Sequence, residues 1–223
     1  MKKSKPKSIL VIGMGRFGKH IAMYMQEMGN SVMVVDRKPE LEHDLVTSFQ
    51  DYLIGDCTNK HVLAALGIPE FDICFVTIGT NFESSIIITS NIKSLGAKYI
   101  VTKAGREVQT DVLKKIGADE VVYPEKELAQ KLAFRYSSSN SKNILDYIEL
   151  AGAYSIFEIA VPAEWVGQTI GALNVRQKYK VNILAIKHES SMQALPSADC
   201  LLNSGDAIIL MGANDDVLRA STS

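Results

Sequence analysis

Residues 9–18 read Ile9-Leu10-Val11-Ile12-Gly13-Met14-Gly15-Arg16-Phe17-Gly18, a short apolar run followed directly by a glycine-rich loop. The apolar run suits a strand that is buried on both faces of a parallel sheet. The glycines are spaced as Gly-x-Gly-x-x-Gly, and residues 19–28 read as a helix that Gly29 can end. A strand, this loop and a helix in that order predict a nucleotide-binding turn, with the helix amino terminus facing the phosphates.

The same alternation continues toward residue 136. Further strands are predicted at 31–35, 51–54, 73–78, 99–102 and 120–123. Helices are predicted at 39–50, 58–66, 81–94, 107–116 and 125–136, with Thr58 and Asn81 as amino-terminal caps. Strands that alternate with helices predict an α/β fold with a Rossmann-type, doubly wound parallel sheet.

The chain changes character after a polar stretch, Ser137-Ser138-Ser139-Asn140-Ser141, which reads as a linker. We therefore expect a nucleotide-binding domain at 1–136, a linker at 137–142 and a second domain at 143–223. Predicted strands at 144–150, 155–161, 181–187, 193–195 and 207–211, with short helices at 169–175 and 215–220, indicate a smaller α+β lobe. A lobe of this size has a marginal core, which favours self-association.

Composition excludes several classes of protein. The formal net charge is -1, which argues against a binder of nucleic acid or of an anionic membrane. No apolar run approaches the roughly 20 residues needed to insert into a bilayer, and the amino end has no signal-peptide pattern. The three cysteines and four histidines are scattered, without metal-ligand spacing. These features predict a cytoplasmic protein with reduced thiols.

Candidate cofactor-binding residues lie where the predicted strands end. Asp36 stands 18 residues after Gly18 and is placed to bind ribose hydroxyls, which disfavours NADP, although the neighbouring Arg37 weakens that exclusion. Asp56 and Cys57 end the third strand, at the expected adenine position. The residues taken as lining the site are Gly13, Met14, Gly15, Arg16, Phe17, Gly18, Asp36, Arg37, Asp56, Cys57, Ile78, Gly79 and Asn81.

Two cations favour a ligand with more negative charge than a dinucleotide's pyrophosphate carries. Arg16 lies inside the glycine loop, and Lys103 ends the fifth strand at the same edge of the sheet. They favour ATP or ADP, while Lys103 reads equally well as a solvated surface residue. No catalytic triad, metal cluster or P-loop is present in the sequence, which predicts a protein that is not an enzyme. The alternative is an NAD-dependent oxidoreductase or an NAD(H)-responsive redox sensor.

Several segments together identify a resemblance that covers essentially the whole chain. They are VIGMGRFG at 11–18, IGDCT at 54–58, VTKA at 101–104, KIGAD at 115–119, YPEKE at 123–127, NILDY at 143–147, NVRQKY at 174–179 and ILAIK at 183–187. The chain resembles the RCK (TrkA/KtrA-like) family, cytosolic regulators of bacterial potassium transporters, and most closely its KtrA/KtrC type.

The resemblance implies a gating subunit that controls a membrane potassium-translocating subunit through ATP/ADP exchange. It also implies a hinge helix between the lobes and a homo-oligomer in the form of an octameric ring. In such a ring Glu125 can reach a neighbouring subunit's nucleotide through Mg²⁺ or Ca²⁺, or it is simply an acid in the first turn of its helix. Asn174 and Arg176 resemble the family's cyclic di-AMP pocket, while Arg176 also suits a helix carboxyl end. One departure is Lys180, where the family usually has glycine.

Overall fold

The computed structural model describes residues 5–137, 143–189 and 191–222. The chain divides into two compact units, Met1–Lys126 and Glu127–Ser223. Helix α6 (Pro124–Ser137) begins in the first unit and continues into the second. Except for Ser137, the predicted linker lies outside the described residues. The domain bounds 1–136 and 143–223 therefore stay a prediction.

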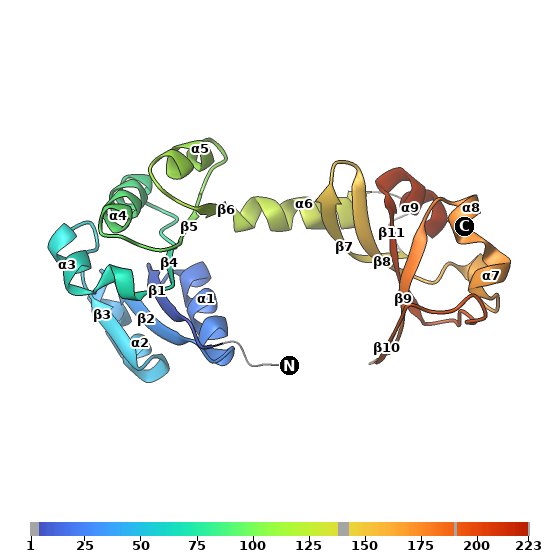
Figure 1. The fold of residues 1–223 in the computed structure, drawn as a ribbon, viewed down its shortest axis with the longest axis horizontal. Coiled ribbons are helices and arrows are strands. Elements are labelled where there is room, and N and C mark those ends of the chain that lie inside the picture. Colours follow the sequence, from blue (N-terminus) through green and yellow to red (C-terminus); the bar gives the residue numbers. More distant parts are fainter. Residues whose placement is uncertain (1–4, 138–142, 190, 223) are drawn as a thin grey trace. The chain divides into compact units, whose positions relative to one another are not determined.

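The first unit is built on a six-stranded sheet in the order β3-β2-β1-β4-β5-β6 (Figure 1). Every neighbouring pair in it is parallel. Its strands are β1 (Ser8–Ile12), β2 (Ser31–Asp36), β3 (Asp51–Ile54), β4 (Ile73–Val76), β5 (Ile100–Lys103) and β6 (Glu120–Val122). The predicted doubly wound sheet is confirmed. Its strand order reverses direction between β1 and β4, which opens a crevice at the carboxyl ends of these two strands.

Helices cover both faces of this sheet. They are α1 (Arg16–Glu27), α2 (Glu42–Ser48), α3 (Lys60–Ala65), α4 (Phe82–Ser94) and α5 (Val108–Lys115), with 3-10 turns η1 (Pro39–Leu41) and η2 (Ile68–Glu70). Helices α1 and α2 pack on one face, through residues such as Ala22 and Leu45. Helices α3 and α4 pack on the other, through Leu63, Ile88 and Ile92. Figure 1 shows the sheet between these two layers.

One predicted helix cap is wrong. Helix α3 is capped by Asn59, whose side-chain oxygen accepts a hydrogen bond from the His61 amide at 3.0 Å. Thr58 is held elsewhere, because its amide and its hydroxyl both donate to Asp56 Oδ1, at 2.9 and 2.8 Å. The Asp56 carboxylate thus holds Thr58 one residue before the cap. The predicted cap of α4 is confirmed, since Asn81 accepts from the Ser84 amide at 3.0 Å.

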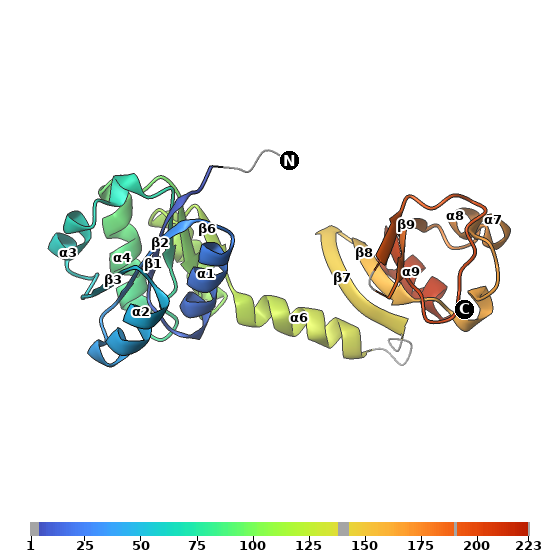
Figure 2. The ribbon, with the colours of Figure 1, turned by 90° about the horizontal axis from the view of Figure 1, so that it is seen from below.

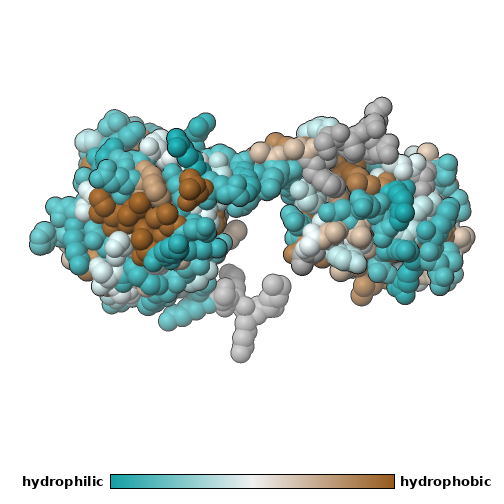
Figure 3. Space-filling view, turned by 90° about the horizontal axis from the view of Figure 1, so that it is seen from above, coloured by the Kyte–Doolittle hydropathy of each residue, from teal (hydrophilic) through white to brown (hydrophobic). Residues whose placement is uncertain are grey.

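Helices α4 and α5 carry exposed apolar side chains. Ile87, Val108 and Val112 are 36%, 76% and 38% exposed. Figure 3 shows apolar side chains gathered on the face of the first unit that carries these helices. This exposed α4–α5 face has no covering element in the part of the chain that the structure describes.

The second unit contains a five-stranded antiparallel sheet in the order β10-β9-β11-β8-β7 (Figure 2). Its elements are β7 (Ile144–Ala151), β8 (Tyr154–Ala160), η4 (Ala163–Trp165), α7 (Ile170–Leu173), α8 (Val175–Lys178), β9 (Asn182–His188), β10 (Ser191–Ala194), β11 (Ala207–Ala213) and α9 (Asn214–Ser221). Buried and half-exposed residues alternate along β8, as expected for a sheet with one buried face. The core includes Phe157, Trp165, Leu210 and, from α9, Val217. The predicted smaller α+β lobe is confirmed.

Candidate nucleotide-binding site

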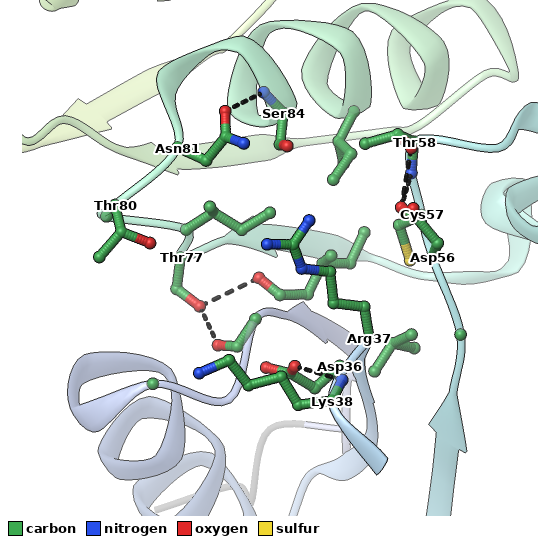
Figure 4. Close-up of a pocket in the computed structure, with 18 residues that line it drawn as sticks. Asp36, Arg37, Lys38, Asp56, Cys57, Thr58, Thr77, Thr80, Asn81 and Ser84 are labelled. Carbon is green, nitrogen blue, oxygen red and sulfur yellow. Dashed lines mark hydrogen bonds between the residues drawn. The ribbon is translucent and has the colours of Figure 1, made fainter. Parts of the chain in front are cut away.

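A pocket of about 210 Å³ opens at the carboxyl ends of β1, β2, β3 and β4 (Figure 4). Nine of the predicted cofactor-binding residues line it. They are Gly13, Gly15, Asp36, Arg37, Asp56, Cys57, Ile78, Gly79 and Asn81. The structure thus gathers residues from four separate segments at the point where the strand order reverses, the usual ligand position in an open α/β sheet.

The glycine loop is held tightly against the fourth strand. Gly13 has φ +99°, which favours glycine, and its amide donates to the Val35 carbonyl at 2.8 Å. The Gly13 carbonyl accepts a hydrogen bond from Thr77 Oγ1 at 2.5 Å. A Cβ on Gly18 would lie 2.0 Å from that same carbonyl oxygen, so only glycine lets α1 start this close to the loop.

The amino terminus of α1 is suited to an anion. Gly15 is its cap residue and provides no side-chain hydrogen bond, and the first turn contains no acidic residue. A Cβ on Gly15 would meet no atom within 4 Å, so the backbone beside it lies open to the pocket. Free N–H groups and the positive end of the helix dipole therefore face the position where phosphate oxygens would lie.

Asp36 is fixed by the backbone rather than left free at the strand end. Its Oδ2 accepts from the Met14 amide at 2.6 Å, and its Oδ1 accepts from the Lys38 amide at 3.0 Å. The carboxylate therefore joins the glycine loop to the end of β2. Each carboxylate oxygen can accept more than one hydrogen bond, so ribose hydroxyls can still be bound. Met14 itself is buried in the core and does not line the pocket.

The other end of the pocket combines a fixed carboxylate with a buried thiol. Hydrogen bonds from Thr58 hold the pKa of Asp56 below its ordinary value, and the charge of Arg37 adds a smaller effect. Burial, with smaller contributions from Asp56 and Asp36, raises the pKa of the Cys57 thiol to about 12. The thiol is therefore protonated at neutral pH and a poor nucleophile, and Cys57 forms part of the pocket wall.

Arg16, Lys103 and Glu125 form a charged group beside the pocket, without lining it. Lys103 Nζ donates to Glu125 Oε1 at 2.5 Å, and only 11% of the lysine side chain is exposed. It also lies 5.6 Å from the centre of the Phe17 ring. Lys103 is thus not a solvated surface residue. Its hydrogen bond, with a smaller attraction from Arg16, holds the pKa of Glu125 below its ordinary value.

Several pocket residues were not expected from the sequence. They are Ile12, Val35, Lys38, Gly55, Thr58, Thr77, Ser84 and Ile88. Among them, Thr77 has the clearest structural role, because its buried hydroxyl is hydrogen-bonded to the Gly13 carbonyl and so fixes the glycine loop; the residue is 5% exposed. The available signal was a hydroxyl residue near the end of the apolar strand that faces the glycine loop, which is a weak pattern by itself.

The remaining two candidates lie in the second unit, apart from the pocket residues. Asn174 joins α7 to α8 in the left-handed conformation, with φ +45°, and is exposed. Arg176 is exposed as well, and its Nε donates to Asn182 Oδ1 at 2.8 Å. Lys180 also has a positive φ, +58°, at the position where the resembled family has glycine.

Within residues 5–137, 143–189 and 191–222, no group of three or more His, Cys, Asp or Glu side chains is placed to hold a metal ion. No helix in these ranges is long and apolar enough to cross a membrane.

Both units match domains of a known protein family. The TrkA-N domain matches residues 9–124, and the TrkA-C domain matches residues 154–222. The chain is 36% identical over 213 residues to Ktr system potassium uptake protein C of Bacillus subtilis (strain 168), covering 96% of this chain and 95% of the relative. It is 35% identical to Ktr system potassium uptake protein A of the same organism, covering 98% and 97%.

Among solved structures, the GsuK channel superposes with a TM-score of 0.70 at 20% identity. The match covers 97% of this chain and 39% of the channel chain. At this identity the likeness supports the fold.

Proposed function

Because the chain belongs to the family with a TrkA-N and a TrkA-C domain, we propose that it is a nucleotide-binding regulatory subunit of a potassium uptake system. The family resemblance predicted from the sequence is confirmed. One observation supports the proposal above the others. The relatives named for potassium uptake match over nearly the whole chain, including the strands and loops that form the pocket.

The pocket supports an adenine nucleotide as the ligand. The open amino terminus of α1 suits phosphates, Asp36 suits a ribose, and the cavity beyond it is lined by apolar side chains and by Asp56. The α1 terminus and the nearby charge of Arg16 favour ATP or ADP. We propose that exchange between these two nucleotides is the regulatory signal.

The Lys103–Glu125 pair supports a role in distinguishing the nucleotides. A γ-phosphate would extend beyond the loop amides toward Arg16, and its charge would compete with Glu125 for Lys103. The residues of one chain do not fit a resident Mg²⁺ or Ca²⁺ ion, since Glu125 is the only carboxylate of this charged group and already binds Lys103. Glu125 enters the proposal as a ligand only across an interface between copies.

The exposed α4–α5 face supports assembly. Ile87, Val108 and Val112 form an apolar surface that a second copy of the chain would bury. We propose an octameric ring of this chain that acts on the cytoplasmic side of a membrane potassium-translocating subunit and is peripheral to the membrane. Light scattering of the purified protein tests the assembly, and a monomer at micromolar concentration with and without ADP contradicts it.

The second unit supports a further ligand. Asn174 and Arg176 are both exposed around the left-handed turn between α7 and α8, and an arginine suits a phosphodiester. We propose cyclic di-AMP as that ligand. Calorimetry on the full chain tests this, and the assignment fails if tens of micromolar cyclic di-AMP gives no binding or if Arg176→Ala leaves it unchanged.

The geometry supports binding rather than turnover. Among the described residues, His188 Nδ1 is hydrogen-bonded to Asp206 Oδ1 at 2.7 Å, and no serine or cysteine side chain is hydrogen-bonded to its other ring nitrogen. The Cys57 thiol is protonated. We propose that the protein is not an enzyme. The alternative, an oxidoreductase or redox sensor that uses NAD(H), predicts NAD(H) as the ligand retained on purification.

The deciding experiment combines ligand identification with potassium uptake. Mass spectrometry of nucleotide released from the purified protein should find ATP or ADP, whereas NAD(H) favours the alternative. In a Bacillus subtilis strain that lacks Ktr system proteins A and C, the chain should restore rubidium uptake at low potassium. Gly15→Ala is the matched control, because it keeps the fold and obstructs the phosphates. Uptake that is equal with both proteins contradicts nucleotide regulation.

A further inference from the structure

Arg37 extends into the pocket without a bonded partner. It follows Asp36, the last residue of β2, and Figure 4 shows its side chain pointing into the cavity between the ends of the strands. Within the described residues its guanidinium makes no hydrogen bond or ion pair. Arg37 is exposed, so a planar cation lines the pocket without a hydrogen-bonded or ion-paired partner among the described residues.

The two nearest carboxylates do not explain this position. Both oxygens of Asp36 accept backbone amides, at 2.6 and 3.0 Å. Asp56 is held by Thr58, and Arg37 lowers its pKa less than the Thr58 hydrogen bonds do. Arg37 therefore lies close to both acids, but it forms a hydrogen bond or an ion pair with neither of them.

An apolar platform lines the same cavity. Ile78 is half-buried and packs against the hydrophobic cluster that contains the buried Val35 and Ile88. A flat base that enters the pocket can lie with one face on Ile78. The other face would then meet Arg37, and a guanidinium stacks favourably on an aromatic ring.

We propose that Arg37 selects the base of the nucleotide, by stacking on a purine whose other face packs on Ile78. The inference rests on the proposed nucleotide-binding function and assigns its base specificity to one residue. A purine offers two fused rings to the guanidinium and to the platform, whereas a pyrimidine offers one. The preference for purines therefore arises at Arg37, and the phosphates are bound separately by α1.

Calorimetric titration of the full chain with ADP and with CDP tests the assignment, because the two ligands share their ribose and phosphates. The unaltered protein should bind ADP at least tenfold more tightly. Arg37→Ala should weaken ADP affinity about tenfold, equivalent to about 1.4 kcal/mol, and change CDP affinity less than threefold. Arg37→Lys should lose most of the same affinity, since an ammonium lacks the planar stacking surface.

Lys38→Ala is the matched control, because Lys38 is the next residue, lines the same pocket and carries the same charge. It should change ADP and CDP affinity by equal factors. Equal losses of ADP and CDP in Arg37→Ala, or full retention of ADP affinity in Arg37→Lys, would show that Arg37 acts as a simple charge and would overturn the inference. Failure of the unaltered protein to bind either ligand would instead refute the proposed function.

Discussion

Replacing Gly18 by alanine tests how the phosphate-binding loop is held. The added Cβ would lie 2.0 Å from the Gly13 carbonyl oxygen and 2.5 Å from Thr77 Oγ1, against 3.4–4 Å for an ordinary contact. The first of these atoms belongs to the backbone and cannot rotate away. Helix α1 or the loop must therefore shift by more than 1 Å, and the Thr77–Gly13 hydrogen bond, now 2.5 Å, is expected to break.

The size of the effect follows from three terms. Overpacking of a buried site costs about 1–3 kcal/mol. The lost hydrogen bond adds about 1 kcal/mol, and the better helix propensity of alanine returns about 1 kcal/mol. The free energy of unfolding of the first unit should therefore fall by about 2 kcal/mol.

Urea unfolding measures this change. With a slope of about 2 kcal/mol per molar urea, the midpoint of the first unit should fall by about 1 M in circular dichroism. Trp165, the single tryptophan, lies in the core of the second unit, so its fluorescence midpoint should not move and serves as an internal reference. An unchanged midpoint for the first unit would refute the close-approach argument for Gly18.

Gly15→Ala is the paired variant. Gly15 has φ -66°, which any residue adopts, and its Cβ would meet no atom within 4 Å. Stability should therefore change by less than about 0.5 kcal/mol, while ADP affinity falls because a methyl group stands where the phosphates approach. If both glycine variants lose the same stability, the distinction between a packing glycine and a ligand glycine is wrong.

Three further predictions concern charge and conformation. In calorimetry, Arg16→Ala should weaken the affinity for ATP more than the affinity for ADP. Glu125→Gln should remove any increase in ATP affinity caused by a divalent ion and leave ADP affinity unchanged. Equal losses of ATP and ADP affinity in Arg16→Ala would contradict this scheme. Lys180→Gly should raise the stability of the second unit by about 1 kcal/mol, because its φ of +58° favours glycine, and a fall in the Trp165 fluorescence midpoint would contradict it. Burial alone would raise the pKa of Asp206, but hydrogen bonds, chiefly that from His188, hold it below its ordinary 3.8. A carboxyl with a lowered folded-state pKa stabilises the unit above pH 3.8 and loses that contribution as the pH falls further, so Asp206→Asn should flatten acid unfolding in that range.

Local patterns in the sequence were enough for the sheet and for the loop. A buried strand such as β1 reads as a continuous apolar run, and glycine spacing after it has few structural interpretations. The alternation of strands and helices then allows little but a doubly wound sheet, and the strand ends at Asp36, Asp56 and Gly79 must meet at one edge. This is why nine of the predicted residues line the pocket.

Contacts between distant segments were decided by the tertiary structure alone. Thr77 is hydrogen-bonded to Gly13, which lies 64 residues earlier in the chain, and Lys103 is hydrogen-bonded to Glu125, which lies 22 residues later. No local pattern encodes such pairs, because each depends on which strands become neighbours and on how far α1 can approach them. The same holds for Arg37, because only the packed ends of the strands show that this exposed side chain borders the pocket. Sequence by itself determined the kind of fold and the edge where a ligand binds, since both follow from the order of elements. Only packing determined which side chains hold the loop and which remain free to contact a nucleotide, because those roles depend on distances between elements that the order does not set.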